Sequence, residues 1–475
     1  MLSMLLWTTA AFAGEGANFL PDDGNGFRRV QAILGLICLW GIAYLLSSDR
    51  KHIVWRPVLW GIALQLLLGA LVLSHTVSGF FFTVVDTGVN QLISFAGDGA
   101  NFVFQSVQPH MIKGPDGTET MYIGTGSGMS PPIKTFAFWV LPTIVFISSL
   151  MSVLYYLGVM QVIVKAIAQV MVRTMGTSGA ESLSGAGNIF VGQTEAPLLI
   201  KPFVGDMTKS ELMAVMTGGF ATVSGGIMGA YVSFLQDVPN IAGHLVMASI
   251  MAAPAALAVA KMTLPETEVP LTRGKLEMPK GDPKDMPKNV IEAAARGASD
   301  GMQLAINVAA MLIAIVGLIA MADWMISFVP MSVCDGSLSA GYECAANVEH
   351  APLSFMAILG RVFAPIAFLM GIPWAEAQVV GKLLGEKIVF TELLAYIDLG
   401  KIIDGPVALL SERSALITSY ALCGFANFAS IGIQLGGIGG IAPHRMSDLA
   451  SLGLRAMFNG VLVGCMTGAV VAIYL

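Results

Sequence analysis

Long apolar segments recur along the whole chain, and most approach the roughly 20 residues that an α-helix needs to cross a bilayer. Eight of them are predicted to be membrane spans: residues 30–48, 55–75, 136–160, 212–235, 246–264, 304–328, 416–437 and 457–475. Residues 80–104 and 351–373 are apolar but interrupted, which favours interfacial or protein-covered helices. The pattern predicts an all-α polytopic membrane protein with about eight transmembrane helices.

Two further segments are long enough to enter a bilayer and return, but too polar to cross it alone. Residues 177–205 hold several Gly and Pro around a polar centre, and residues 379–406 hold charged residues among apolar ones. Non-helical backbone survives at membrane depth only where protein or a wet cavity covers it. Both segments are therefore predicted to be re-entrant helical hairpins.

The two hairpins occupy matching positions, because each follows one span and precedes two others. The intervening loops predict that they open on opposite sides of the membrane. Such an inverted repeat is typical of secondary transporters, whose substrate site lies near the midplane. The chain then divides into an N-terminal tail or possible signal segment (1–29), spans for scaffold and oligomerisation (30–135), a first transport repeat (136–288) and a second (289–475).

Composition supports a lipid environment and excludes several functions. The chain is 55% hydrophobic and 12% charged, about half the charge of a soluble domain. A net charge of −6 without clustered basic residues predicts no binding of nucleic acid. No Rossmann or Walker glycine motif is present, so the sequence shows no nucleotide-binding motif that could drive pumping by ATP. Cys334 and Cys344 flank a polar loop that could hold a disulfide in an oxidising compartment.

Basic residues in the short loops predict the orientation. Arg50, Lys51 and Arg56 place the first connection in the cytoplasm. Eight spans then leave both termini outside, in a multi-pass protein of the inner membrane. Three lysines of the second hairpin lie on the outer side in this scheme, and we expect pairing with Glu386 and Asp404: Lys382, Lys387 and Lys401.

The first hairpin carries the densest candidate chemistry, in the sequence GNIFVGQTEAPLLIKPF at residues 187–203. A carboxylate, two amides and a hydroxyl lie within eight residues: Asn188, Gln193, Thr194 and Glu195. Burying them without partners would cost several kcal/mol in total. The cluster therefore indicates a ligand site rather than a hairpin tip that satisfies its own carbonyls.

In the second hairpin, Glu392 repeats the placement of Glu195. This repetition favours a functional role, although an ion pair with Lys387 or Lys382 is the alternative.

Two predicted spans contain enough glycine to break. In residues 421–443 (ALCGFANFASIGIQLGGIGGIAP), Asn427 and Ser430 lie three apart and share one helical face. Gly432 and Gly436 fit close helix packing as an alternative use of the same glycines.

The matching span, residues 217–231 (TGGFATVSGGIMGAY), is broken around Thr222. Broken helices expose carbonyls that suit sodium. The candidate ligands are the side chains of Asn188 and Thr222 with the carbonyls of Val191 and Val223.

At these residues the sequence resembles the concentrative nucleoside transporter family. The motifs are GQTEAP at 192–197, NVIEAAARGASDG at 289–301 and GFANFASIGIQLGGIGG at 424–440. The second hairpin's motif is met by Gly385, Lys387 and TELLAY at 391–396, where Thr391, Leu393 and Leu394 depart from the family pattern.

The resemblance implies a homotrimer with eight core spans and two hairpins per subunit. It implies nucleobase contacts by Gln193, Thr194 and Glu195, with Phe425 packing near the base. It also implies contacts to the ribose hydroxyls by three residues of the second repeat: Glu392, Asn427 and Ser430. Sodium would bind at Asn188, Val191, Thr222 and Val223, and the resemblance implies no organic cofactor.

Sodium–nucleoside symport is therefore the leading prediction. A proton-coupled symporter that titrates Glu195 or Glu392 is the nearest alternative. A channel or structural membrane protein is a remote one, and it predicts no saturable uptake. The chain shows no nucleophile–base set or metal motif, so it is not expected to be an enzyme.

Overall fold

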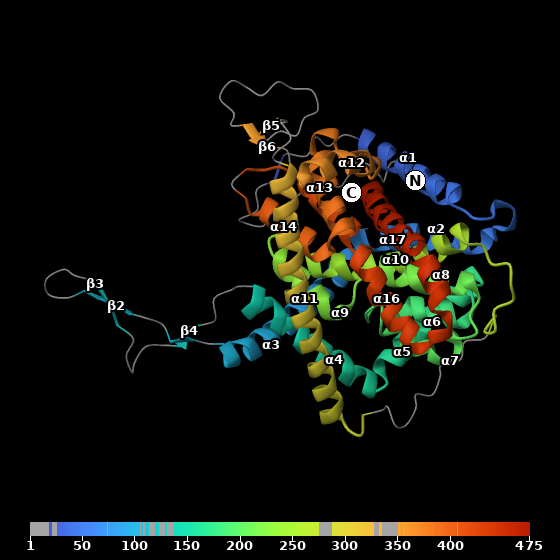
Figure 1. Ribbon diagram of the computed structural model, residues 1–475, viewed down its shortest axis with the longest axis horizontal. Helices are drawn as coiled ribbons and strands as arrows, with labels where there is room; N and C mark the ends of the chain where they lie inside the picture. The colour runs from blue at the N-terminus through green and yellow to red at the C-terminus, as the bar shows by residue number, and fades with distance from the viewer. Residues whose placement is uncertain are drawn as a thin grey trace.

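The computed structural model describes residues 19–20, 26–73, 75–104, 106–107, 110–113, 119–122, 129–130, 136–274, 287–326, 332–334, 350–352, 354–405 and 407–475. Residues 1–18 of the possible signal segment and Cys344 lie outside the described residues, so cleavage and the disulfide remain predictions. What is described is almost entirely helical (Figure 1), which confirms the predicted fold class.

The N-terminal part supplies three helices: α1 (Phe27–Leu45), α2 (Trp55–Leu73) and α3 (His75–Phe104). A 3-10 turn at Arg50–His52 separates α1 from α2, and the Asp49 side chain caps it by accepting from the Lys51 amide at 3.1 Å. The chain ends with α17 (Met446–Tyr474), which packs against α1 and α2.

Short strands form three two-stranded antiparallel ribbons within two loops. The pairs are β1 (Ser106–Val107) with β4 (Met129–Ser130), β2 (His110–Lys113) with β3 (Glu119–Tyr122), and β5 (Ser332–Cys334) with β6 (His350–Pro352). In Figure 1 the β2–β3 ribbon extends away from the helices. Hence the strands add nothing to the helical core.

The first repeat begins with a π-helical turn (Phe136–Val140) and α4 (Leu141–Tyr156). The remaining elements are α5 (Val159–Met175), α6 (Gly179–Gly187), a 3-10 turn (Ala196–Ile200), α7 (Lys201–Val204), α8 (Lys209–Ala221), α9 (Gly225–Phe234) and α10 (Ile241–Thr263). The predicted first hairpin corresponds to α6, the loop after it and α7. The break between α8 and α9 at residues 222–224 is where the sequence predicted it.

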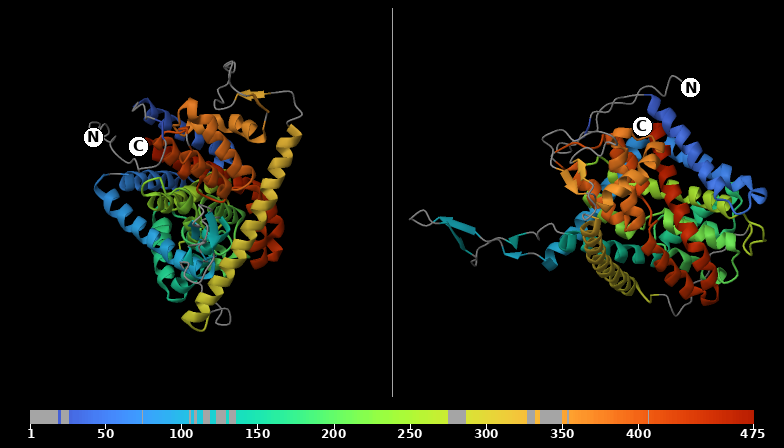
Figure 2. Two further views of the ribbon diagram at one scale, coloured as in Figure 1. Left: turned by 90° about the vertical axis from the view of Figure 1, so that its left-hand side faces the viewer. Right: turned by 45° about the horizontal axis from the view of Figure 1, so that its top comes forward.

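The second repeat begins with α11 (Val290–Ile326), a single helix of 37 residues. The remaining elements are α12 (Phe355–Leu369), α13 (Trp374–Val389), α14 (Glu392–Ile403), α15 (Glu412–Leu422), α16 (Phe428–Ile441) and a 3-10 turn (Pro443–Arg445) before α17. The second hairpin is α13 with α14, and the second broken span is α15 with α16. In both views of Figure 2, α11 runs along one side of the bundle.

The predicted spans all correspond to helices. Among the described residues, five helical segments are long and apolar enough to cross a membrane, or up to seven if each bent pair counts as one span. The eight predicted spans are these five, α4 from the bent pair α4–α5, the shorter apolar helix α2, and the broken α15–α16 span; the other bent pair, α12–α13, was not predicted as a span. Apolar residues on α11 are exposed, among them Ile313 at 78%, so this helix presents an apolar face outward.

The two hairpins open toward opposite ends of α17. At one end, the Arg445 guanidinium donates to the Gly205 carbonyl after α7 at 3.0 Å. At the other end, Arg413 donates to the carbonyls of Gly371 before α13 and Ala472 near the C-terminus, at 2.9 and 2.7 Å. Since α17 has 29 residues, it extends about 43 Å. The hairpins therefore open on opposite sides of a membrane-thick molecule.

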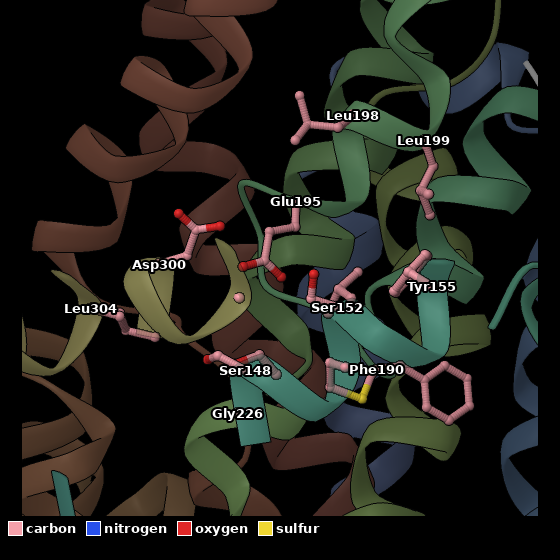
Figure 3. A pocket seen from close by; sticks show the side chains of 14 residues that line it. Ser148, Ser152, Tyr155, Phe190, Glu195, Leu198, Leu199, Gly226, Asp300 and Leu304 are labelled. Carbon is pink, nitrogen blue, oxygen red and sulfur yellow. The ribbon is translucent and has the colours of Figure 1, made fainter. Parts of the chain in front are cut away.

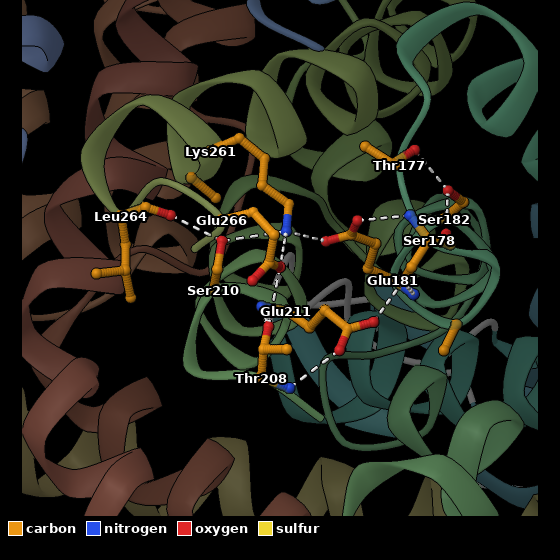
Figure 4. Close-up of polar contacts among 12 residues, drawn as sticks. Thr177, Ser178, Glu181, Ser182, Thr208, Ser210, Glu211, Lys261, Leu264 and Glu266 are labelled. Atoms are coloured by element: carbon orange, nitrogen blue, oxygen red, sulfur yellow. Dashed lines mark hydrogen bonds and ion pairs between the residues drawn. The ribbon is translucent and has the colours of Figure 1, made fainter. Parts of the chain in front are cut away.

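A buried polar network fixes the open end of the first hairpin (Figure 4). Ser178 and Glu181 form a capping box that begins α6, and Thr208 and Glu211 form one that begins α8. Ser178 Oγ donates to Glu211 at 2.5 Å, so the two boxes are joined. Lys261 of α10, 4% exposed, lies 2.9 Å from both Glu181 and Glu266.

The lysines of the second hairpin do not all have the partners that the sequence predicted. Lys382 lies 3.6 Å from Glu386, as expected. Lys401 pairs with Asp398 at 2.9 Å rather than with Asp404, because Asp398 lies one turn earlier on the same helix. The Lys387 ammonium is buried and donates to the carbonyls of Ala421 and Cys423, both at 2.9 Å.

Candidate functional site

The tips of the two hairpins line one cavity of about 540 Å³. Gly192–Glu195 come from the first hairpin and Thr391–Leu393 from the second. The rest of the wall comes from α4, α9, α11 and the α15–α16 span, including Ser148, Ser224, Ile227, Asp300, Gln303, Leu304, Asn307, Val308, Phe425, Asn427, Ala429, Ser430 and Ile433. The volume suits a small organic ligand.

Glu195 closes the turn at the first tip and remains exposed to the cavity. Its Oε2 accepts from the Gly192 amide at 3.0 Å. Beside it lies a second cavity of about 300 Å³, between the first hairpin, α4 and α11. Figure 3 shows the Glu195 and Asp300 carboxylates facing the same space. Both residues line both cavities, so the two spaces adjoin at this pair.

Glu392, at the start of α14, is 2% exposed and has two hydrogen-bond donors. The Tyr231 hydroxyl donates to its Oε1 at 2.8 Å, and Asn427 Nδ2 donates to its Oε2 at 2.9 Å. The ion pair with Lys387 or Lys382 that the sequence left open is not formed. Each carboxylate oxygen keeps a lone pair, so Glu392 can still accept from hydroxyl groups in the cavity.

The break between α15 and α16 places Asn427 and Phe425. Asn427 caps α16, since its Oδ1 accepts from the Ser430 amide at 2.8 Å. Gly424 has φ +102°, and a Cβ there would lie 2.6 Å from the Phe220 carbonyl oxygen. A side chain at position 424 would therefore push the break away from the end of α8.

Thr194 and Gln193 of the first tip pack against α16. A Cβ on Gly437 would lie 2.7 Å from Thr194 Cγ2. Gln434 Nε2 donates to Gln193 Oε1 at 3.0 Å. By contrast, a Cβ on Gly432 or Gly436 would meet nothing within 4 Å in the described part of the chain. The packing predicted for those two glycines therefore occurs at Gly437 instead.

Of the candidate sodium ligands, the side chains of Asn188 and Thr222 both lie beside Gly218, where α6 meets α8. Asn188 is 1% exposed, and neither its Oδ1 nor its Nδ2 has a hydrogen-bond partner among the described residues. A Cβ on Gly218 would lie 3.3 Å from that Nδ2, and Thr222 Oγ1 donates to the Gly218 carbonyl at 2.9 Å. Because a buried amide without partners is costly, the Asn188 oxygen is suited to a cation.

Reasoning from the sequence missed several polar residues of the cavity wall, Asp300 among them, and two residues that contact the wall from behind, Gln434 and Tyr231. Gln434 lies four residues after Ser430 and seven after Asn427, so helical spacing could have placed it on their face. Asp300 lies within the motif at 289–301, where a single aspartate beside other polar residues does not indicate a position in a cavity wall. Tyr231 gave no signal, because a tyrosine near the end of an apolar span is ordinarily an interfacial residue.

Opposed hairpins, two broken helices and a polar cavity between them define a secondary transporter. Comparison with known sequence families then identifies its kind. Residues 34–107 match the N-terminal part and residues 244–472 the C-terminal part of the Na+ dependent nucleoside transporters, and residues 137–238 match a nucleoside recognition region. The chain belongs to the Na+ dependent nucleoside transporter family.

Individual relatives agree with this assignment. An uncharacterized transporter of Haemophilus influenzae is 39% identical, over 94% of this chain and 98% of its own. Solute carrier family 28 member 3 of Mus musculus is 38% identical over the full chain, which spans 61% of that relative. Sodium/nucleoside cotransporter 1 of Mus musculus is 39% identical over 95% of the chain and 65% of its own.

Solved structures also match this fold. A structure of CNTnw in an inward-facing substrate-bound state superposes with a TM-score of 0.81 at 39% identity, covering 95% of this chain and 98% of that one. A CNTnw variant in an outward-facing state gives 0.77 at 39% identity, covering 94% and 97%.

Proposed function

We propose that this protein binds a nucleoside in the cavity between the hairpin tips and carries it across the membrane together with sodium. The observation that carries the proposal is the buried Glu392 carboxylate, which Tyr231 and Asn427 hold at the cavity wall. A carboxylate accepts strongly from a pair of hydroxyls, and a ribose supplies such a pair. Asn427 and Ser430 complete the ribose end.

The nucleobase would lie at the opposite end, against the first hairpin. Gln193, Thr194 and Glu195 offer donors and acceptors for the base edge, and Phe425 offers an aromatic surface for its face. A substrate that lacked one hydroxyl would leave a polar partner unpaired, which costs about 1–3 kcal/mol.

Sodium would be held by the side chains of Asn188 and Thr222 and the carbonyls of Val191 and Val223. The lone, buried Asn188 oxygen supports this donor set. The same hairpin connects the two sites, because Asn188 ends α6 and the base-reading tip follows within seven residues. Ordering of this loop by one ligand would favour binding of the other, so the coupling would be reciprocal.

A proton-coupled symporter using Glu195 or Glu392 is the alternative. The Glu195–Asp300 pair at the two cavities favours it, because two nearby carboxylates can share a proton. The unpartnered Asn188 favours sodium.

We further propose that three copies assemble in the inner membrane with both termini outside. The exposed apolar face of α11 supports contact with lipid or with a neighbouring subunit. Arg29 near the start of α1 donates to the Leu475 carbonyl at 3.1 Å, so the helical N-terminus and the C-terminus share one side.

Uptake of radiolabelled uridine into proteoliposomes, with and without an inward sodium gradient, tests the function. Accumulation above equilibrium that disappears when the gradient is dissipated is the expected result. Uptake that follows only an inward proton gradient would remove the sodium site and keep the substrate. Absence of uptake under both gradients would refute the nucleoside assignment.

A further inference from the structure

The amide of Gln193 can present either an oxygen or an NH2 group to a ligand, and this choice decides which base edge it reads. Amide oxygen and nitrogen are assigned from their hydrogen-bond partners. In this protein the orientation of the amides is decided by a backbone carbonyl, which can only accept a hydrogen bond. The chain of contacts runs from Met216 through Gln434 to Gln193.

Gln434 is fully buried on α16. Its Nε2 lies 3.1 Å from the Met216 carbonyl oxygen of α8 and 3.0 Å from Gln193 Oε1. Since a carbonyl only accepts, Gln434 must turn its NH2 group toward Met216. The second hydrogen of that NH2 group then points to Gln193, which must present its oxygen.

The other atoms of the pair agree with this orientation. Among the described residues, Gln434 Oε1 has no hydrogen-bond partner, so both bonds of this side chain are the two donations. Gly219 leaves the space for the pair, because a Cβ there would lie 2.7 Å from Gln434 Nε2 and 2.9 Å from Gln193 Cβ. Gln193 itself lines the larger cavity.

We propose that Gln434 is a positioning residue that fixes the Gln193 amide with its NH2 group toward the cavity, so that the site selects nucleobases that present an acceptor there. The inference rests on the proposed function. It adds the direction of the hydrogen bond to the base: the Gln193 NH2 group donates, and an atom of the base accepts. A base with a carbonyl oxygen at this point satisfies it.

Nucleosides that lack one oxygen of the base test the direction of this hydrogen bond without any mutation. Sodium-driven uptake would be measured for uridine and for two analogues, each lacking one of the two carbonyl oxygens. We expect the kcat/KM of one analogue to fall about tenfold, the usual effect of one lost hydrogen bond. Equal uptake of all three nucleosides would overturn the proposal, while failure of uridine uptake itself would refute the proposed function instead.

A double-mutant cycle tests the role of Gln434. Gln434→Met keeps the length of the side chain and removes both donations, so it should assemble. We expect it to raise the KM for uridine about tenfold and to abolish discrimination among the three nucleosides. In a Gln193→Ala background the same change should have no further effect, because Gln434 acts through Gln193.

An equal KM increase in both backgrounds would show a merely structural role and overturn the proposal. Gln65→Met is the matched control. Gln65 is also a buried glutamine, 1% exposed, and it donates to Thr467 Oγ1 at 3.0 Å away from the cavity. Gln65→Met should leave the discrimination among the three nucleosides unchanged. If Gln434→Met fails to assemble, Gln434→Leu and the analogue comparison carry the test.

Discussion

At the scale of single residues, the site is defined by which hydrogen-bonding capacity remains unused. The Asn427 amide oxygen accepts from the Ser430 amide, and its NH2 group donates to Glu392. Glu392 accepts from Asn427 and Tyr231 and retains lone pairs. Because part of each side chain is already hydrogen-bonded within the protein, only its remaining donors and acceptors are available to a ligand. The Tyr231 ring stacks on Tyr396 with centroids 4.3 Å apart, which fixes the hydroxyl in turn.

Neutralising either hairpin carboxylate should cripple uptake. In Glu392→Gln the amide oxygen can still face Asn427 and its NH2 group can face the Tyr231 oxygen, so the protein should assemble. In Glu195→Gln the oxygen can still accept from Gly192, but an NH2 group replaces a cavity acceptor. We expect uridine uptake to fall at least about tenfold in each variant.

Uptake into proteoliposomes would measure the transport activity of each variant, and elution of the purified protein on size exclusion would show whether it assembles. Glu292→Gln, at a partly exposed carboxylate near the start of α11 and outside the cavity, is the control and should retain activity. Normal transport by both hairpin variants would disprove the site assignment.

At the scale of helices, close approach between elements decides the geometry of the tips. Glycines allow such approach only at particular positions of α16. Gly437 faces Thr194, whereas Gly436 faces open space within the subunit. Two adjacent glycines of one helix therefore have different roles, although their helix propensities are the same.

Gly437→Ala should displace the first hairpin, and Gly436→Ala should not. The new methyl group at 437 would overlap Thr194 Cγ2, 2.7 Å from the Cβ position, and such overpacking costs about 1–3 kcal/mol. We expect the KM for uridine to rise roughly tenfold in Gly437→Ala. Equal kinetics for the two variants would show that this contact does not position the tip.

At the scale of the whole molecule, the first hairpin is fixed to α8 and α10 through buried charge. Lys261 bridges Glu181 of the hairpin and Glu266 after α10, and the two capping boxes join at Ser178. A buried pair is not in itself a source of stability, but loss of one partner leaves an uncompensated charge. The hairpin should therefore behave as one body with these helices.

Lys261→Met should destabilise the protein strongly, by about 3–5 kcal/mol. Lys401→Met removes an exposed lysine that also has a carboxylate at 2.9 Å, and should cost less than about 1 kcal/mol. The fraction of correctly assembled protein after heating in detergent, measured for both variants and the parent, checks this. Similar losses for the two variants would indicate that the buried network contributes no more than a surface pair.

The sequence by itself determined the class of element and about half of the polar residues that line the cavity. Apolar segments of spanning length predict helices because a bilayer leaves backbone groups no other partner. Carboxylates and amides inside such segments mark a site because burying them alone is costly. These two arguments located both hairpins, Glu195 and Glu392, and the glycines within two apolar spans located both breaks.

Only the tertiary structure decided which atoms of those residues remain available to a ligand. Tyr231 contacts Glu392 across 161 positions and Gln434 contacts Gln193 across 241. Such pairs have no local signature, because a hydrogen bond depends on distance in space and not on spacing in the chain. For the same reason the glycine that packs on the first hairpin could not be assigned from the sequence, whereas the partner of Lys401 lies only three residues earlier on the same helix and does follow from helical spacing. The fold selects one partner from several that are chemically equivalent.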